Sequence, residues 1–150
     1  MPVRPAVAED APAIVSLIGR AAPHLDTKAY ANGRLPEGVV ALVAELRGRL
    51  VGWLEGVVDD AYTGPGAPVP PPHGYVLAIV VDPGTRRQGV GRGLMEAFVR
   101  VAREAGVRWV FLFPEEGTGV RERMEFFEAC GFEAVGDPGG EHPAMGRRVG

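Results

Sequence analysis

Three arginines and two glycines gather in one short stretch of this chain, where their types and spacing suit the binding of an anion. The stretch reads Arg86-Arg87-Gln88-Gly89-Val90-Gly91-Arg92. Glycine lets a ligand approach the backbone closely, and arginine supplies a permanent positive charge with several N–H donors. A Gly-x-Gly triplet alone carries little information here, because glycine makes up 22 of the 150 residues. The triplet gains meaning from the elements on either side of it.

A strand and a helix are expected to flank this loop. The β-branched apolar run from Tyr75 to Val81 predicts a strand that stops at Asp82, because Pro83 cannot continue a sheet ladder. A helix is then predicted from the spacing of Val90, Leu94, Ala97, Phe98, Val101, Ala102 and Ala105, with Gly106 as its terminator. The first turn of a helix has unpaired backbone N–H groups and the positive end of the helix dipole, which favours a phosphate or pyrophosphate ligand.

Length and charge restrict the class of protein. With 150 residues, 46% of them hydrophobic, residues 1–150 should form one domain. Sixteen basic and nineteen acidic residues give a net charge of −3, which predicts no general attraction to nucleic acid or to an anionic membrane. A lone cysteine, Cys130, excludes an internal disulfide, and the N-terminus does not read as a signal peptide, so a cytoplasmic protein is expected.

The remaining elements mix helices and strands without regular alternation. Strands are predicted at residues 3–7, 39–46, 50–58, 107–113, 132–135 and 144–149. Helices are predicted from a cap at Asp10 to Pro23, in a short piece within residues 25–32, and at residues 120–130 with Gly131 as the stop. This order indicates a mixed α/β (α+β) fold.

Residues 59–73 differ from the rest in being rich in proline and glycine. Such a segment can form neither a helix nor a central strand. It is either a mobile connector or a loop laid over a functional cleft, and both interpretations stay open.

Other kinds of site fit the sequence poorly. A nucleotide-hydrolysing Walker loop needs Lys-Ser or Lys-Thr after its last glycine, where this loop has Arg92-Gly93. A dinucleotide fingerprint belongs to the first βαβ unit of a chain, and this loop follows several strands. No metal site is predicted, because His24, His73 and His142 lie far apart and each is expected to be a solvated loop residue. Cys130 is predicted to be a buried packing thiol.

The strand and loop together resemble the acetyl-CoA-binding signature of the GNAT acetyltransferase superfamily. The residues that carry this resemblance are Ile79-Val80-Val81-Asp82-Pro83 and Arg86-Arg87-Gln88-Gly89-Val90-Gly91. Similarity extends along most of the chain, in Val3-Arg4-Pro5-Ala6, Val51-Gly52-Trp53 and Phe126-Phe127-Glu128-Ala129-Cys130-Gly131-Phe132. It implies a GNAT-like fold, with a mixed central sheet of about seven strands, about four helices, and two central strands splayed at the cofactor cleft.

The resemblance also implies a cofactor, acetyl-CoA, and the residues that hold it. The backbone of Ile79, Val80 and Val81 would bind the pantetheine arm, and Arg87 to Arg92, with Arg86 beside them, would cradle the pyrophosphate. The reaction implied is direct attack of a neutral amine on the thioester, with the backbone N–H of Val80 or Val81 polarising the carbonyl. A base is needed for an ordinary amine; the candidates are Glu116, Glu115, Glu55, Asp59 and His73, and we favour Glu116 because it comes just after the fifth strand.

The sequence departs from the family on the proton-donating side. Phe127 stands where many members have a tyrosine that protonates the leaving thiolate, and Val120 is near the place of a frequent asparagine. Tyr30, Tyr62 and Tyr75 are candidate substitutes for the tyrosine. Because a thiolate is a tolerable leaving group, catalysis need not be lost.

Three functions follow as hypotheses. The first is an N-acetyltransferase, an acyltransferase acting on a primary amine of a small molecule or protein; acids at positions 26, 59, 60, 137 and 141 would suit a cationic acceptor. The second is a non-catalytic acyl-CoA-binding module, and the third a plain α/β domain without a cofactor. Whether two copies pair as a homodimer is left open.

Overall fold

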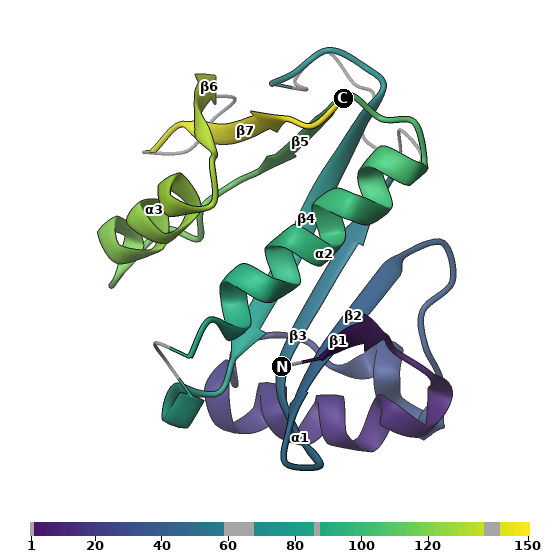
Figure 1. The fold of residues 1–150 in the computed structure, drawn as a ribbon. Helices are drawn as coiled ribbons and strands as arrows, with labels where there is room; N and C mark the ends of the chain where they lie inside the picture. Colours follow the sequence, from purple (N-terminus) through teal and green to yellow (C-terminus); the bar gives the residue numbers. More distant parts are fainter. Residues whose placement is uncertain (1, 59–67, 86–87, 137–141) are drawn as a thin grey trace. The chain divides into compact units, whose positions relative to one another are not determined.

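The computed structural model describes residues 2–58, 68–85, 88–136 and 142–150, and divides the chain into two compact units (Figure 1). The first unit contains Met1–Gly56 and Leu77–Phe98, and the second contains Val57–Val76 and Val99–Gly150. Hydrogen bonding orders the strands β1-β2-β3-β4-β5-β7-β6, with β4 and β5 parallel and β5 and β7 antiparallel. The mixed α/β class and the seven strands predicted from the sequence are confirmed.

The first unit holds the N-terminal strands and helices. Its elements are β1 (Val3–Pro5), η1 (Ala8–Asp10), α1 (Ala11–Ala21), η2 (Lys28–Gly33), β2 (Val40–Leu46) and β3 (Arg49–Val57). The strands β2 and β3 form the expected hairpin, but its turn consists of Arg47 and Gly48 alone, with φ of 53° and 75°. Two residues with positive φ give a turn whose twist matches the twist of the strands, so β3 begins at Arg49, one residue earlier than predicted.

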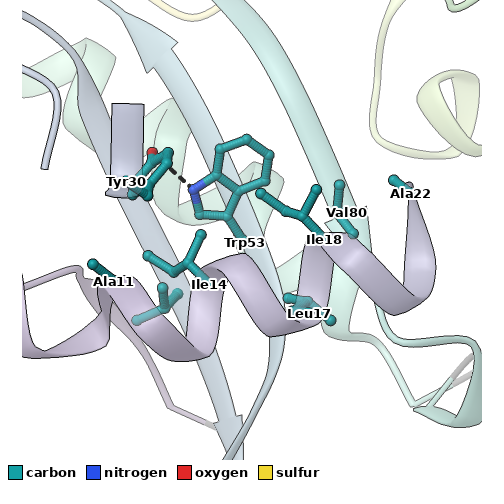
Figure 2. Close-up of a cluster of buried hydrophobic side chains, with 9 residues drawn as sticks. Ala11, Ile14, Leu17, Ile18, Ala22, Tyr30, Trp53 and Val80 are labelled. Atoms are coloured by element: carbon teal, nitrogen blue, oxygen red, sulfur yellow. Dashed lines mark hydrogen bonds between the residues drawn. The ribbon is translucent and has the colours of Figure 1, made fainter. Parts of the chain in front are cut away.

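Helix α1 buries one face against the sheet of its unit. The core contains Ala11, Ile14, Leu17 and Ile18 of α1 together with side chains of the strands and η2, namely Val43, Trp53, Val80 and Tyr30 (Figure 2). The apolar residues of α1 recur at helical spacing, which places them on one face. Trp53 and Val80 therefore mark the α1-facing side of β3 and β4.

Asp10 does not cap α1 as predicted. Its carboxylate bonds instead to the Arg4 guanidinium at 2.7 and 2.9 Å and to the Val7 N–H at 2.8 Å. These contacts fasten β1 to the turn before α1, and the Arg4 hydrogen bonds lower the pKa of the Asp10 carboxyl below its usual value. Arg4 also pairs with Glu45 on β2.

The second unit is built from the C-terminal elements. They are β5 (Trp109–Leu112), α3 (Val120–Ala129), β6 (Glu133–Gly136) and β7 (Ala144–Arg148). The last hairpin is confirmed, since β6 and β7 pair antiparallel. Gly131, with φ of 88°, follows α3 as the predicted terminator, and Cys130 is a buried free thiol as expected.

Strand β4 (His73–Val81) and helix α2 (Val90–Glu104) each run through both units. The prediction that β4 begins near Tyr75 was wrong, because His73 and Gly74 already pair with Trp109 and Val110 of β5. His73 is 2% exposed and packs edge-on against Phe111, so it is a core residue rather than a solvated loop histidine. Its side chain was misassigned because the prolines before it suggested a loop.

The described end of the proline-rich segment is packed. Val69 is buried, and the Pro72 carbonyl accepts a 3.0 Å hydrogen bond from the Arg108 N–H. Val69 and Pro72 thus attach this end of the segment to the rest of the second unit. Residues 59–67, including Asp59, Asp60 and Tyr62, lie outside the described part of the chain.

Candidate active site

The predicted anion loop connects the end of β4 to the start of α2, both within the first unit. Strand β4 ends at Val81, a short η3 turn covers Pro83–Thr85, and α2 starts at Val90. Gly89, with φ of 78°, precedes the helix, and its carbonyl accepts a 2.9 Å bond from the Gly93 N–H. A left-handed φ is costly for residues other than glycine, so the chain needs Gly89 to enter α2 in this way.

The site residues predicted for the cofactor follow one another along this connection. Ile79 and Val81 are partly exposed, whereas Val80 is buried in the α1 core. Gln88 and Gly89 are exposed, Val90 and Gly91 are buried, and Arg92 is exposed at the first turn of α2. Arg86 and Arg87 lie outside the described residues. The N–H groups of the first helical turn are thus presented next to the exposed glycine loop.

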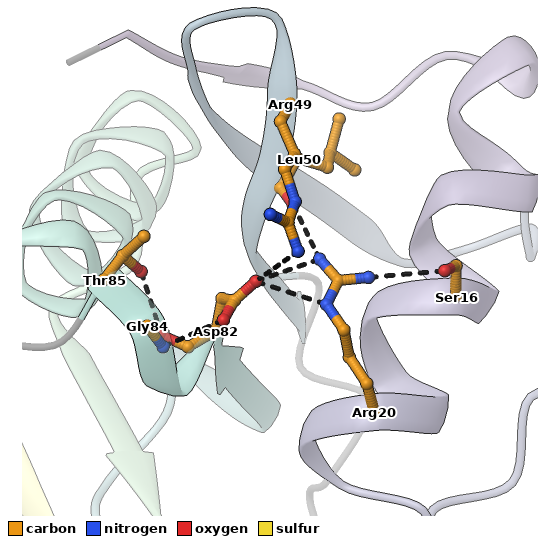
Figure 3. A network of polar contacts seen from close by, with 7 residues as sticks. All are labelled: Ser16, Arg20, Arg49, Leu50, Asp82, Gly84 and Thr85. Atoms are coloured by element: carbon orange, nitrogen blue, oxygen red, sulfur yellow. Dashed lines mark hydrogen bonds and ion pairs between the residues drawn. The ribbon is translucent and has the colours of Figure 1, made fainter.

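Asp82 fixes the turn that leads into the loop (Figure 3). Its side chain accepts a 2.9 Å bond from the Gly84 N–H, and its carbonyl accepts bonds of 2.9 Å from both the N–H and the hydroxyl of Thr85. Arg20 of α1 approaches the Asp82 carboxylate at 3.1 and 3.2 Å, and Arg49 of β3 approaches it at 3.2 Å. The Gly84 N–H and the Arg20 guanidinium lower the pKa of Asp82 below its usual value.

The start of α2 lies close to β3 because of Gly52. A Cβ built on Gly52 would lie 2.6 Å from Val90 Cγ1 and 2.9 Å from Leu94 Cδ1, too near for any real side chain. The missing side chain lets the first turns of α2 approach the strand backbone. Gly52 and Asp82 thereby set the position of the loop from two sides.

The direction of one N–H group on β4 follows from a backbone bond. The Asp82 N–H donates to the Val51 carbonyl on β3 at 2.8 Å. Because successive N–H groups of an extended strand point to opposite sides, the Val81 N–H points away from β3. Of the two residues considered as carbonyl-polarising donors, Val81 is the one whose N–H is directed away from its β3 neighbour.

A second group of polar residues lies in the second unit, after β5. The Glu116 carboxylate contacts His142, with 2.6 Å between Oε1 and Nδ1 and 3.1 Å between Oε2 and the His142 N–H. The Glu116 side chain is 40% exposed. The Arg123 side chain bonds to the carbonyls of Glu115 and Thr118 and so closes the loop between β5 and α3. His142 was predicted to be solvated and instead pairs with the carboxylate.

A family comparison gives the wider relationship of this site. The model of the acetyltransferase (GNAT) family matches residues 12–132. The chain belongs to the GNAT family. The resemblance seen in the sequence is therefore confirmed over most of the chain.

Individual GNAT relatives agree with this assignment. The chain is 37% identical over 78 residues to a mycothiol acetyltransferase of Propionibacterium freudenreichii subsp. shermanii, over 51% of this chain and 24% of that protein. It thus spans about a quarter of the length of that curated relative. The fold is similar to the GNAT domain of S. lividans PAT, with TM-score 0.78, 20% identity, and coverage of 98% of this chain and 89% of the other.

An aminoglycoside 6'-N-acetyltransferase crystallised with coenzyme A is also similar in fold. The TM-score is 0.72 at 15% identity, over 99% of this chain and 97% of that chain. Likeness at this level of identity concerns the fold.

Phe127, which stands at the predicted tyrosine position, lies among other aromatic rings. Phe127 is 6% exposed and packs against Phe126 and Phe132, with ring centroids 5.3 and 6.4 Å away. Tyr75 is stacked on Phe111 at 4.7 Å within the second unit. The Tyr30 hydroxyl donates a hydrogen bond to Glu55. Tyr62, the remaining candidate, lies outside the described residues.

Two residues that shape this GNAT loop were missed by sequence reasoning. Arg20 and Asp82 are 62 positions apart, and no pattern links a helix arginine to a strand end. The only available signal was Asp-Pro-Gly-Thr at residues 82–85, which is typical of a turn closed by an aspartate side chain.

Among the residues that the structure describes, no helix has the length and apolar character that a membrane span requires. No group of three His, Cys, Asp or Glu side chains in that part of the chain is arranged to hold a metal ion.

Proposed function

We propose that this chain is an N-acetyltransferase that moves the acetyl group of acetyl-CoA to a primary amine of a small molecule or protein. The observation that carries the proposal is the glycine loop at the α2 N-terminus, held by Asp82 and Gly52 in a chain of the GNAT family. Exposed backbone N–H groups at a helix start suit the pyrophosphate of the cofactor. Ile79, Val80 and Val81 would hold the pantetheine arm, and residues Arg86 to Arg92 the phosphates.

The proposed chemistry is direct attack of the neutral amine on the thioester carbonyl. The nitrogen forms a bond to the carbonyl carbon, the tetrahedral intermediate collapses, and the C–S bond breaks to release the coenzyme A thiolate. The Val81 N–H, directed away from β3, is the proposed donor to the carbonyl oxygen as negative charge develops there.

Glu116 is the proposed general base, acting directly or through water. Its partly exposed carboxylate is held in place by His142. Glu116 lies in the short loop that follows β5. The amine proton would pass to the carboxylate or to a water beside it. With Phe127 buried among aromatic rings, the thiolate would leave without a tyrosine donor, which its ordinary pKa near 8.5 permits.

Location and assembly are part of the same proposal. We place the protein in the cytoplasm, because its lone cysteine, Cys130, is a free buried thiol. We propose that residues 1–150 form one acetyltransferase domain. We also propose that two copies form a homodimer, which a measurement of the mass in solution tests.

Thiol release from acetyl-CoA tests the proposal. The protein is mixed with acetyl-CoA and a panel of primary amines, and free thiol is measured over time. Turnover with any amine excludes a non-catalytic acyl-CoA-binding module, which Phe127 would otherwise favour. A protein that is stabilised by coenzyme A but turns over no amine would contradict the enzymatic proposal, because binding to the native state alone raises the melting temperature.

A further inference from the structure

Glu55 is an acidic side chain in an otherwise buried part of β3. Across Val51–Val57 it is the one residue that is not fully buried. It stands two positions after Trp53, so its side chain lies on the same, α1-facing side of the strand. Its cross-strand partner on β2 is Ala41, which has no polar side-chain group to bond to the carboxylate.

A chain of hydrogen bonds holds Glu55 in place. The Trp53 Nε1–H donates to the Tyr30 hydroxyl at 3.0 Å, as Figure 2 shows, and the Tyr30 hydroxyl donates to Glu55 Oε2 at 2.5 Å. The Trp53 indole can only donate, so the Tyr30 oxygen accepts a hydrogen bond from it, and the Tyr30 O–H donates a hydrogen bond to the carboxylate. Burial, and then the bond to Glu55, raises the pKa of Tyr30 far above its usual range, so this proton is retained.

This arrangement gives Tyr30 a role other than that of a proton donor to the leaving thiolate. Tyr30 is 3% exposed, and its ring meets Trp53 edge-on at 5.7 Å. Its hydroxyl orients one oxygen of Glu55 and is not available to protonate a leaving thiolate. Tyr30 is therefore a positioning residue for the carboxylate.

Glu55, which is partly buried, differs from Asp10 and Asp82, the buried acids of this unit, in having no cationic partner among the described residues. Asp10 pairs with Arg4, and Asp82 with Arg20 and Arg49. Among the residues that the structure describes, no lysine, arginine or histidine forms an ion pair with Glu55, whose bond to Tyr30 involves Oε2 alone. Because Glu55 is only partly buried and Tyr30 bonds to Oε2, a cation from outside the chain can approach Oε1.

We propose that Glu55 receives a positively charged ammonium group of the acceptor, separate from the neutral amine that attacks the thioester, which makes the substrates alkylamines with a second, cationic group. This inference rests on the proposed acetyltransferase function and names the class of acceptor for it. Oε1 accepts from the ammonium, while Tyr30 keeps Oε2 fixed. Glu55 lies in the same unit as Val80 and Val81, on the side of the sheet that Val80 faces.

The first test compares a charged with an uncharged acceptor. The probes are 1,5-diaminopentane, which is cationic at pH 7, and aniline, which is not. Glu55→Gln keeps the shape and an acceptor oxygen but removes the charge, so KM for the diamine should rise about 10- to 100-fold, as expected for loss of a charge-assisted hydrogen bond. KM for acetyl-CoA and the rate with aniline should stay unchanged.

Glu45→Gln is the matched control. Glu45 lies on the neighbouring strand β2 in the same unit, but Arg4 already compensates its charge. The Glu45→Gln variant should therefore have the same ratio of diamine turnover to aniline turnover as the wild type. Equal losses in the two variants, or an unchanged diamine KM in Glu55→Gln, would overturn the assignment of Glu55.

A second readout does not depend on turnover. The chain has two tryptophans, Trp53 and Trp109, and only the Trp53 indole N–H is linked through Tyr30 to Glu55. Titration with 1,5-diaminopentane should shift the Trp53 indole resonance saturably, leave that of Trp109 in place, and have no effect in Glu55→Gln. Absence of the Trp53 shift overturns the inference; a shift without acetylation of any amine overturns the proposed function and keeps Glu55 as an ammonium site.

Tyr30→Phe tests the positioning role. It removes the bond that orients Oε2, so the preference for the diamine over aniline should fall several-fold, less than in Glu55→Gln. A variant that is only less stable, with its charge preference intact, would show that Tyr30 has a purely structural role.

Discussion

Asp82 and Glu116 are two carboxylates that come after the parallel strands β4 and β5, and they are built in opposite ways. The Asp82 side chain is 12% exposed and is bonded to a backbone N–H and two arginines. The Glu116 side chain is 40% exposed and pairs with His142. A carboxylate so fully engaged organises the backbone, whereas a more exposed one remains able to exchange protons with a substrate. The comparison gives Asp82 a structural role and is consistent with the proposal that Glu116 is the base.

The largest effect is expected for Glu116→Gln, which removes the proposed base. General base catalysis typically contributes about 10² to 10⁴ in rate, so kcat with an alkylamine should fall by that factor. The melting temperature should change little, because the side chain is partly exposed. Glu115→Gln, one residue earlier in the same loop, is the control and should retain activity; similar activity in both variants would remove Glu116 from the mechanism.

Gly52→Ala comes next, because it introduces a side chain where none fits. The added methyl would press on Val90 and Leu94 at the start of α2. Overpacking of this kind costs about 1–3 kcal/mol, and displacement of the helix start should also raise KM for acetyl-CoA. Urea unfolding and acetyl-CoA saturation measure the two effects.

Gly19→Ala provides the comparison for Gly52→Ala. Gly19 lies within α1, and a Cβ built there meets no atom within 4 Å. The same substitution should therefore stabilise the protein by up to about 1 kcal/mol. If Gly19→Ala lost as much stability as Gly52→Ala, close packing around Gly52 would not be the cause of the loss.

Asp82→Asn should change the pH dependence of stability. The folded pKa of Asp82 lies below the unfolded value of 3.8, so its contribution is present above that pH and is lost as the pH falls toward the folded pKa. The free energy of unfolding of the wild type should therefore drop below about pH 4, and Asp82→Asn should drop less. Urea unfolding between pH 3 and 6 gives both curves; parallel curves would contradict the role of the charge.

Phe127→Tyr should have the smallest effect on the reaction. The ring is buried against Phe126 and Phe132, so an added hydroxyl needs a partner and costs stability rather than reaching a thiolate. We expect kcat to change less than about tenfold, below the usual contribution of a general acid. A much larger gain in kcat would show that the tyrosine position still faces the leaving group.

The fold and the strand and helix on either side of the proposed cofactor loop could be predicted because their signals are local. A β-branched run, a proline, glycines and a helical spacing follow one another between Tyr75 and Gly106, and the observed β4 and α2 agree with them to within a few residues. Gly106 and Gly131 have the left-handed conformation predicted for helix terminators, with φ of 83° and 88°. Backbone preferences of this kind are contained in a few neighbouring residues.

The polar contacts could not be predicted because they join distant positions. Tyr30 and Glu55 are 25 positions apart, and Glu116 and His142 are 26 apart. His73 was assigned to a loop for a similar reason: its burial depends on pairing with β5, more than thirty residues later in the sequence. The sequence around a carboxylate does not show whether its partner in the fold is an arginine, a tyrosine or solvent.

Calorimetric titration with coenzyme A tests the central claim, that the glycine loop before α2 binds the cofactor. Two variants share one chemical change: Gly89→Ala in that loop and Gly117→Ala after β5, both at positive φ with open space around the added methyl. We predict that the wild type and Gly117→Ala bind coenzyme A alike and that Gly89→Ala binds at least about tenfold more weakly, a loss of about 1.4 kcal/mol. No binding by the wild type, or equal weakening in both variants, would contradict the account.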